Sequence, residues 1–342
     1  MSKKKHCTYL FIIQRTGLSE ADVKEISGYL ALLNSTGCDV VVVDASPLDV
    51  YAAHEGAWFS LCRHVKVDSR YLSWNPFINS IYTGVFQAAC QKVIAASESV
   101  RYSPEDILRM CELLEHFELV RPQNYLYPLH WWNQIESAGI LINRTVLPGG
   151  DSPETFGFLC TSFKKFCNRK DRSFDSSEDL TREFIFHRAK VCFALDFLIQ
   201  KNSSTFSDWC GKCFRETYRT FSFGIQPVTF LLMFPLGVAL WLFLGAEALI
   251  FYTSAILLSF ITIAFLGRFR GGNRFFPVRL SLAAPAWLFE RMLCYYKTLF
   301  WMLNPGKHPL LAPSGRKKSR HYYIKGLNTV KLLEGNRKTQ KN

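Results

Sequence analysis

Two adjoining apolar runs constrain this 342-residue chain more than any other feature. Residues 228–244 and 248–266 contain no charged side chain, and only Gly245, Ala246 and Glu247 separate them. Each run approaches the ~20 residues that a helix needs to cross a bilayer. A core helix of a soluble protein rarely runs this long without a polar face. The sequence therefore predicts a transmembrane helical hairpin, with a buried hairpin in a soluble core as the alternative.

The charges around these runs predict the orientation of the hairpin. Basic residues stand on both outer sides of it and none stands in the turn: Lys212, Arg215, Arg219, Arg268, Arg270 and Arg274. Because cytoplasmic loops carry the excess of Lys and Arg, this pattern places both ends of the hairpin in the cytoplasm. We expect a multi-pass protein of the inner (cytoplasmic) membrane, with its N-terminal part and its C-terminus facing the cytoplasm.

A third apolar stretch, residues 280–303, differs from the first two because it carries charges. Glu290, Arg291 and Lys297 lie within it, together with aromatic side chains such as Trp287 and Trp301. A third span would place charges at mid-depth in the bilayer, where each is costly. The stretch is therefore predicted to be a helix lying in the membrane interface, and a third span is the alternative.

The C-terminal tail is strongly basic. The chain has 41 Lys and Arg against 28 Asp and Glu, a formal charge of +13. From residue 307 onward ten residues are basic and only Glu334 is acidic. Such a balance predicts an anionic partner. Beside a membrane hairpin the nearer partner is an anionic lipid headgroup, and no nucleic acid is expected.

Residues 1–222 alternate between short β-rich runs and helical patterns. Acidic residues follow Ser19 and Ser103, and Pro104 comes directly after Ser103, which is typical of helix starts. Strands are expected at 8–13, 39–43, 64–67, 92–95 and 119–120, and helices at 20–33, 78–90 and 103–116. This alternation predicts an α/β fold with a mostly parallel sheet and helices on both faces.

Acidic side chains follow two of the predicted strands. Asp44 and Ser46 come after the run 39–43, and Ser97-Glu98-Ser99 comes after the run 92–95. In an open parallel sheet, ligands bind beyond the carboxyl ends of the strands. An acid at a strand end is also common as a turn or capping residue. As a ligand, Glu98 offers the hard oxygen that Mg²⁺ or Mn²⁺ prefers when it bridges diphosphate oxygens.

The order of these features resembles the glycosyltransferase family 2 group, in which a GT-A nucleotide-sugar-binding fold is joined to a membrane anchor. The resemblance extends over most of residues 8–303. Besides the hairpin, the matching segments are Val41-Val42-Val43-Asp44-Ala45-Ser46, Tyr82-Thr83-Gly84-Val85, residues 93–102, residues 120–125 and residues 149–155. The resemblance implies a GT-A-like fold, a nucleotide-sugar donor and a divalent metal, Mg²⁺ or Mn²⁺.

The resemblance also implies roles on the donor side. Asp44, with Ser46 beside it, would bind the nucleoside of the nucleotide sugar. Glu98 would hold the metal, because it stands in the position of the family's Asp-x-Asp motif. Ser97 and Ser99 replace the acids of that motif, so one carboxylate remains where two or three are expected.

On the acceptor side, the resemblance implies an acid that deprotonates the attacking hydroxyl. Glu178 and Asp179 are the candidates, with Glu183 as a third. From the residues alone, Glu178 and Asp179 also fit a solvated pair that caps a helix. Arg215 matches the arginine of the family's Gln-x-x-Arg-Trp motif, which contacts the diphosphate or the acceptor; the Gln and the Trp of that motif are absent here.

Two classes of function follow. The first is an inverting glycosyltransferase that moves a sugar from a nucleotide-sugar donor to a hydroxyl acceptor, lipid-linked or close to the membrane. The second is a catalytically inactive GT-A-like binding or scaffold protein at the membrane, which the degenerate motif favours. The expected segments are a donor-binding domain at 1–222, the hairpin at 223–275, the interfacial helix at 276–304 and the basic tail at 305–342.

Two other features of the sequence, its cysteines and an aromatic cluster, indicate less about function. Cys210 and Cys213 form a Cys-x-x-Cys pair, but the apolar hairpin begins where a thioredoxin-like site needs a compact domain. The 11 cysteines are scattered and no secretory signal precedes them, so reduced thiols are predicted. The aromatic residues from Tyr125 to Trp132 fit core packing or the stacking of a sugar ring.

Overall fold

The computed structural model describes residues 5–14, 18–68, 75–151, 154–167, 176–220 and 225–304, apart from the side chains of residues 215, 216, 218–220, 225 and 226. The described chain forms two compact units. One holds the residues up to Cys210 together with Leu236–Glu290, and the other holds Gly211–Pro235 together with the described residues from Arg291 onward. The predicted basic tail lies outside the described residues.

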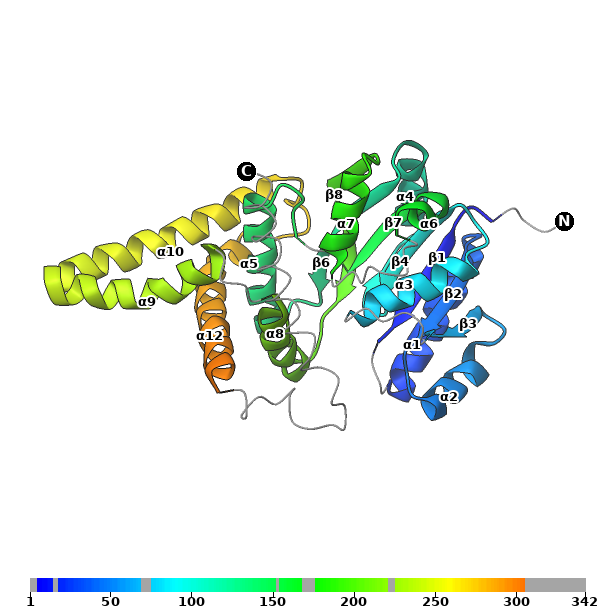
Figure 1. Ribbon diagram of the computed structural model, residues 1–342, viewed down its shortest axis with the longest axis horizontal. Helices are drawn as coiled ribbons and strands as arrows, with labels where there is room; N and C mark the ends of the chain where they lie inside the picture. The colour runs from blue at the N-terminus through cyan, green and yellow to red at the C-terminus, as the bar shows by residue number, and fades with distance from the viewer. Residues whose placement is uncertain are drawn as a thin grey trace, which may run out of the picture. The chain divides into compact units, whose positions relative to one another are not determined.

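The first unit is built around one eight-stranded sheet with the order β3-β2-β1-β4-β7-β6-β8-β5 (Figure 1). Its strands are β1 (Thr8–Ile13), β2 (Asp39–Asp44), β3 (Arg63–Lys66), β4 (Lys92–Ser97), β5 (Val100–Arg101), β6 (Leu119–Tyr127), β7 (Thr155–Leu159) and β8 (Val191–Asn202). Strands β1 to β4 are parallel, as are β6 and β8, whereas β7 and β5 run antiparallel to their neighbours. The predicted, mostly parallel sheet is confirmed.

Helices cover both faces of this sheet. They are α1 (Glu20–Ser35), α2 (Leu48–Trp58), α3 (Pro76–Gln87), α4 (Pro104–His116), α5 (Trp131–Val146), α6 (Cys160–Cys167) and α7 (Ser177–Phe186). Apolar residues of α1, α2 and α4 form a core on one face, and those of α3, α6 and α7 form a second core on the other. The predicted α/β class is therefore confirmed.

Local sequence chemistry explains where these elements begin and which way their side chains point. Ser19 and Ser103 each close a capping box, with Asp22 and Asp106 respectively, at the starts of α1 and α4. Along β1, Tyr9, Phe11 and Ile13 enter the first core, and Leu10 and Ile12 enter the second. This alternation is the period-2 pattern of a strand buried on both faces.

The predicted apolar hairpin consists of two long helices, α9 (Ile225–Leu244) and α10 (Ala246–Phe269). Both are long and apolar enough to cross a membrane. Gly245 turns the chain between them at φ 88°, a conformation that favours glycine. Phe243 is 85% exposed and Phe251 78% exposed. Both helices thus leave large apolar side chains exposed among the described residues, and their crossing of a membrane stays a prediction.

The last turns of α10 dock onto α5. A Cβ at Gly267 would lie 1.9 Å from the carbonyl oxygen of Leu141, so only glycine allows the two backbones to approach this closely. The Thr145 hydroxyl donates to the Ile263 carbonyl at 2.7 Å. The buried Arg144 guanidinium donates to the carbonyls of Gly267 and Leu195 at 3.3 and 2.9 Å. The end of α10 is therefore fixed to α5 within the unit that holds the sheet.

Three further helices complete the chain: α8 (Phe206–Thr220), α11 (Arg279–Leu282) and α12 (Ala284–Leu303). At the start of α12, Trp287 packs so tightly against Gly139 of α5 that a Cβ there would meet its indole nitrogen at 2.2 Å. The stretch predicted to lie in the membrane interface is thus mostly one helix. Its position at an interface stays a prediction.

Candidate functional site

Asp44 is the last residue of β2, and its carboxylate lies in a buried polar cluster, which we call the sealed centre. Its side chain is 0% exposed. Its Oδ1 accepts from the backbone N–H of Ser46 at 2.8 Å, and its Oδ2 lies 2.8 Å from His54 Nδ1 and 3.1 Å from His64 Nε2. Burial alone would raise the pKa of Asp44, but the hydrogen bonds from His64, Ser46 and His54 hold it well below its usual range. The carboxylate is therefore ionised and engaged by its own chain.

A surface groove of about 550 Å³ borders this centre. It lies between the first turns of α1 and the helix α2, and Lys24, Asp49 and His54 are among its lining residues. Asp44 does not line it, and neither does Ser46, which is also buried. Of the groups in this centre, His54 is the one that lines the groove, so Asp44 could act on a ligand there only through the histidine.

The turn after β4 separates Glu98 from its two neighbouring serines. The hydroxyls of Ser97 and Ser99 lie 2.8 Å apart. The Glu98 carboxylate instead accepts from the backbone N–H of Gln14 at 3.1 Å, beyond the end of β1. The sequence predicts these three side chains as one ligand set, but the two serines contact each other whereas the Glu98 carboxylate contacts the end of β1.

Glu154 and Lys201 complete the surroundings of this turn, and the sequence reasoning assigned no role to either. Glu154 Oε2 accepts from the hydroxyls of both Ser97 and Ser99 at 3.1 Å. Glu154 Oε1 accepts from Lys201 Nζ at 2.9 Å. Glu154 lies in the matching segment 149–155, which was the available signal, whereas nothing in the sequence links Lys201 to this turn.

These residues do not fit a resident divalent ion as predicted for Glu98. Among the described residues no group of three His, Cys, Asp or Glu side chains could hold a metal. The carboxylate nearest the two serines, Glu154, already pairs with an ammonium group. Mg²⁺ often binds through one or two carboxylates together with waters and substrate phosphates. The described residues therefore offer no three-acid site for the predicted Mg²⁺ or Mn²⁺, and the acid next to the two serines is engaged by Lys201.

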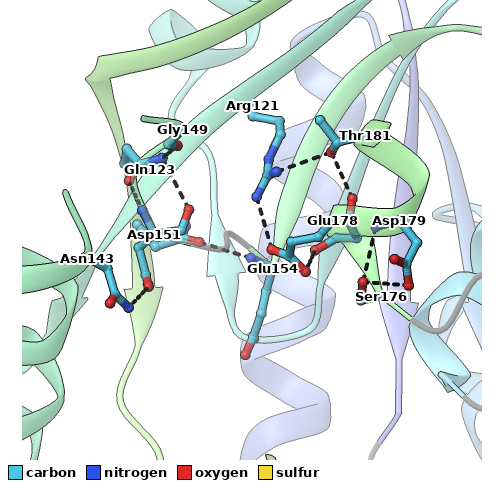
Figure 2. Close-up of polar contacts among 12 residues, drawn as sticks. Arg121, Gln123, Asn143, Gly149, Asp151, Glu154, Ser176, Glu178, Asp179 and Thr181 are labelled. Carbon is cyan, nitrogen blue, oxygen red and sulfur yellow. Dashed lines mark hydrogen bonds and ion pairs between the residues drawn. The ribbon is translucent and has the colours of Figure 1, made fainter. Parts of the chain in front are cut away.

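Polar side chains of β6 position the segment that carries Glu154. Gln123 Oε1 accepts from the backbone N–H of Asp151 at 2.8 Å, and Asn124 Oδ1 accepts from that of Glu154 at 3.1 Å. The Asn143 amide of α5 donates to the Asp151 carboxylate at 2.7 Å. Figure 2 shows Gln123 and Asn143 directed at Asp151. Buried amides thus fix the approach to Glu154.

Glu178 stands in the first turn of α7 and pairs with Arg121 of β6 (Figure 2). Arg121 is buried; it donates to Glu178 at 3.3 Å and to the Thr181 hydroxyl at 3.2 Å. Burial lowers the pKa of Arg121, and the Glu178 carboxylate offsets part of that effect. Glu178 itself is 41% exposed. The carboxylate therefore has a guanidinium partner on its inner side while solvent still reaches it.

Asp179 and Glu183 make contacts that belong to helix α7. The Ser176 hydroxyl accepts from the backbone N–H of Asp179 at 3.1 Å and donates to its carboxylate at 2.9 Å. Asp179 also pairs with Arg182 at 3.5 Å. Glu183 is buried and lies 3.2 Å from His187 Nε2. The helix-capping alternative therefore describes Asp179, whereas Glu178 faces Arg121.

Three other predicted features lie elsewhere in the chain: Arg215, the cysteines and the aromatic cluster. Arg215 lies on α8, but its side chain is outside the described residues. None of the described cysteines, including Cys210 and Cys213, is part of a disulfide bond. Near the start of α5, the rings of Trp131 and Trp132 contact Phe206, with centroids 5.2 and 5.8 Å apart. Trp131 is largely exposed, so this cluster is a surface as well as a core feature.

Comparison with known proteins gives similar structures at low identity. A mannosyltransferase from Pyrobaculum calidifontis, in complex with GDP-Man and Mn²⁺, is 13% identical, with a TM-score of 0.46 over 86% of this chain and 87% of its own. Glucosyl-3-phosphoglycerate synthase from Mycobacterium tuberculosis, in complex with Mn²⁺, UDP and its glucosylated product, is 12% identical, with a TM-score of 0.40 over 62% of this chain and 80% of its own.

Neither comparison with sequences identifies a family. No protein-family model matches the chain, and no curated protein matches it. The two structural neighbours are nucleotide-sugar glycosyltransferases, but at these TM-scores the likeness carries no argument about this chain's reaction. The fold described above rests on its own strand order and helix layers.

Proposed function

We propose that this chain is a membrane-anchored inverting glycosyltransferase of the GT-A type, which moves a sugar from a nucleotide-sugar donor to a hydroxyl acceptor. One observation carries the proposal. Glu178 pairs with the buried Arg121, and its side chain remains 41% exposed to solvent. The resemblance implies a base at this acid pair, and the pairing with Arg121 supports Glu178 over Asp179 as the candidate.

The donor would bind along the edge of the sheet. Its nucleoside would lie in the groove beside His54, with Asp44 holding the histidine and Ser46 shaping the turn. Its diphosphate would lie toward the turn of Glu98, and Arg215 of α8 is a further candidate contact for it. The roles of Asp44, Ser46, Glu98 and Arg215 come from the resemblance, and the sealed environment of Asp44 makes its role an indirect one.

The reaction follows from the position of the base. Glu178 would accept the proton of the acceptor hydroxyl while the hydroxyl oxygen attacks the anomeric carbon of the sugar. The bond between that carbon and the diphosphate oxygen breaks, and its electron pair leaves with the nucleoside diphosphate. Attack opposite the leaving group inverts the configuration of the sugar. Arg121 would not touch the acceptor; it would orient Glu178 and keep it ionised.

The hairpin would set the location and the acceptor class. α9 and α10 would cross the inner membrane, with the sheet and the C-terminus in the cytoplasm and the helix α12 in the interface. A domain tethered in this way works at the depth where a lipid-linked hydroxyl presents itself, so the acceptor would be lipid-linked or close to the membrane. The basic tail would bind anionic headgroups. The predicted division at residues 222, 275 and 304 belongs to this proposal.

Cysteine labelling tests the topology. In a chain whose native cysteines are replaced by serine, Ala246→Cys in the turn should react with a membrane-impermeant maleimide added outside intact cells. A cysteine in the tail, such as Ser319→Cys, should react only after the cells are opened. Labelling of the tail from outside would contradict the topology, because the charge asymmetry places both termini inside.

A second function, a non-catalytic binding protein at the membrane, has one observation in its favour. Both oxygens of Asp44 are engaged inside the chain, and serines stand where metal-binding acids are expected. Such a protein would bind a nucleotide or a partner without turning a donor over.

Donor turnover decides between the two functions. The purified chain in detergent is incubated with a panel of UDP- and GDP-sugars and a membrane lipid extract, and release of nucleoside diphosphate is measured. An active transferase releases it from at least one donor in a way that depends on the extract, and Glu178→Gln abolishes the release. Nucleotide binding without release from any donor would support the non-catalytic function instead.

A further inference from the structure

The ammonium group of Lys201 lies near two carboxylates, one of which also accepts from two serine hydroxyls. Its Nζ is 2.9 Å from Glu154 Oε1 and 3.8 Å from Glu136 Oε1. The other oxygen of Glu154 accepts from the hydroxyls of Ser97 and Ser99. These oxygens come from three distant parts of the chain: the turn after β4, the segment before β7 and the helix α5. They meet at the turn where the resemblance places a metal motif.

Strand pairing holds Lys201 in this position. Lys201 lies opposite Val100 where β8 pairs with β5, and the backbone N–H of Asn202 donates to the Ser99 carbonyl at 2.7 Å. The lysine side chain is only 13% exposed. A largely buried ammonium group needs anionic partners to offset its lost hydration, and two carboxylates provide them. Lys201 is therefore held in place beside the turn by strand pairing and by its two carboxylate partners.

The same oxygens are of the kind that bind Mg²⁺ or Mn²⁺, since carboxylates and hydroxyls are hard donors. A divalent ion at Glu154 would lie within a few ångströms of the lysine ammonium, and two positive charges at that distance repel strongly in a part-buried site. The two cations are thus alternative occupants of one position. In this structure the lysine occupies it.

We propose that Lys201 is a tethered cation that takes the place of the divalent metal at this turn, so that the nucleoside diphosphate is bound without added metal. The ammonium group has three N–H donors, and the diphosphate would accept from it beside Glu154 and the two serine hydroxyls. The part of the proposal that concerns the diphosphate rests on the proposed function, whereas the part that concerns the cation position does not.

Binding of Mn²⁺ alone tests the cation position without any substrate. The full chain in detergent is titrated with Mn²⁺, and the electron paramagnetic resonance signal of the free ion is measured. The parent should bind Mn²⁺ no more tightly than Lys190→Met, a control at an exposed lysine of the same protein. Lys201→Met keeps the length of the side chain and removes its charge. It should gain one Mn²⁺ site, with affinity at least about tenfold above the parent.

The variants identify the ligands of that new site. Glu154→Gln added to Lys201→Met should abolish the gain, and Lys201→Arg, which keeps the charge, should show no gain. Tight binding of one Mn²⁺ by the parent would overturn the proposal, because the position would then accept a metal beside the lysine. An Mn²⁺ affinity of Lys201→Met equal to that of the parent would also overturn it.

Binding of UDP and GDP in the presence of EDTA tests the diphosphate. The nucleotide that binds the parent should do so with the same affinity in EDTA and in Mg²⁺. Lys201→Met should lose about tenfold or more of that affinity in EDTA, the size expected for one charge-assisted hydrogen bond. Binding that requires Mg²⁺ would overturn the metal-independent site. If neither nucleotide bound in either condition, the proposed function would fail, while the Mn²⁺ titration would still decide the cation position.

Discussion

Asp44 and Glu178 are two carboxylates of the same domain that differ in what surrounds them. Asp44 is fully buried, and two histidines and a backbone N–H occupy its oxygens. Glu178 pairs with one buried arginine and remains 41% exposed. Removing the charge of a buried and fully hydrogen-bonded carboxylate is destabilising, whereas a solvent-exposed carboxylate can exchange a proton with a ligand. The comparison separates a structural acid from a candidate catalytic acid.

Among the substitutions that distinguish these two carboxylates, Glu178→Gln should have the largest effect, which is on the rate of sugar transfer. The substitution keeps the shape of the side chain and removes its basicity. With the donor that the panel identifies, transfer should fall about 10²–10⁴-fold, the usual contribution of a general base. Nucleotide binding should stay at the parental value, because the base acts on the acceptor in the transition state. Initial rates and nucleotide titrations measure the two effects.

Glu112→Gln, at an exposed acid of α4, is the matched control and should leave the transfer rate unchanged. If Glu178→Gln kept more than a tenth of the parental rate, Glu178 would not be the base. Glu183→Gln would then be the next variant, because Glu183 is the remaining acid on the inner side of α7.

Asp44→Asn should act on stability. The asparagine amide carries no negative charge, so the buried histidines lose an ionised hydrogen-bond acceptor. This loss should lower the free energy of unfolding by about 3 kcal/mol. For a domain of this size, that cost corresponds to a loss of about 6–12 °C in Tm. Thermal unfolding of the purified chain in detergent measures it. Asp196→Asn breaks a surface pair with Arg109 and should cost about 1 kcal/mol or less. Equal Tm values for the two variants would contradict the sealed centre.

The same centre predicts how stability depends on pH. Because the pKa of Asp44 is held well below its usual range in the folded chain, the unfolded chain binds the proton first as pH falls. The stability that Asp44 contributes is therefore complete above about pH 4, its ordinary pKa, and is lost as pH falls toward the lowered folded value. The Tm difference between the parent and Asp44→Asn should be constant above that pH and should narrow below it. A difference that stayed constant down to pH 3 would show that the carboxylate charge is not involved.

The fold was predictable because local signals were strong and agreed with each other. Ser19 and Ser103 marked helix starts that form capping boxes, and the β-branched run 39–43 marked a strand that lies inside the sheet. The hairpin was predictable because no charge interrupts either run. The order of strands was not predictable, since the antiparallel insertion of β7 between β4 and β6 depends on contacts far apart in the sequence.

Within the candidate site, local sequence signals predicted only contacts between residues that are close in sequence, such as the cap of Asp179 by Ser176. The roles of Glu178 and Glu98 were named from the resemblance, and their partners Arg121 and Gln14 lie 57 and 84 residues away. His54 and His64, which seal Asp44, come from a helix and a strand that follow it, and neither carries a motif. Lys201 reaches Glu154 across 47 residues through the pairing of β8. Long-range pairing of this kind leaves no local pattern, so its partners appear only in the folded chain.

The smallest effect should come from Asp179, the neighbour of Glu178. Its contacts with Ser176 and Arg182 belong to the start of α7. Asp179→Ala should therefore cost about 1 kcal/mol of stability, the usual value of a helix-capping interaction, and Ser176→Ala should cost about the same. The double variant should cost little more than either one, because the two residues share one interaction. The rate of sugar transfer should stay within about twofold of the parental rate, because Asp179 caps the helix and Glu178 is the proposed base. A loss of transfer by Asp179→Ala as large as that expected for Glu178→Gln, without a matching loss by Ser176→Ala, would move the role of the base from Glu178 to Asp179.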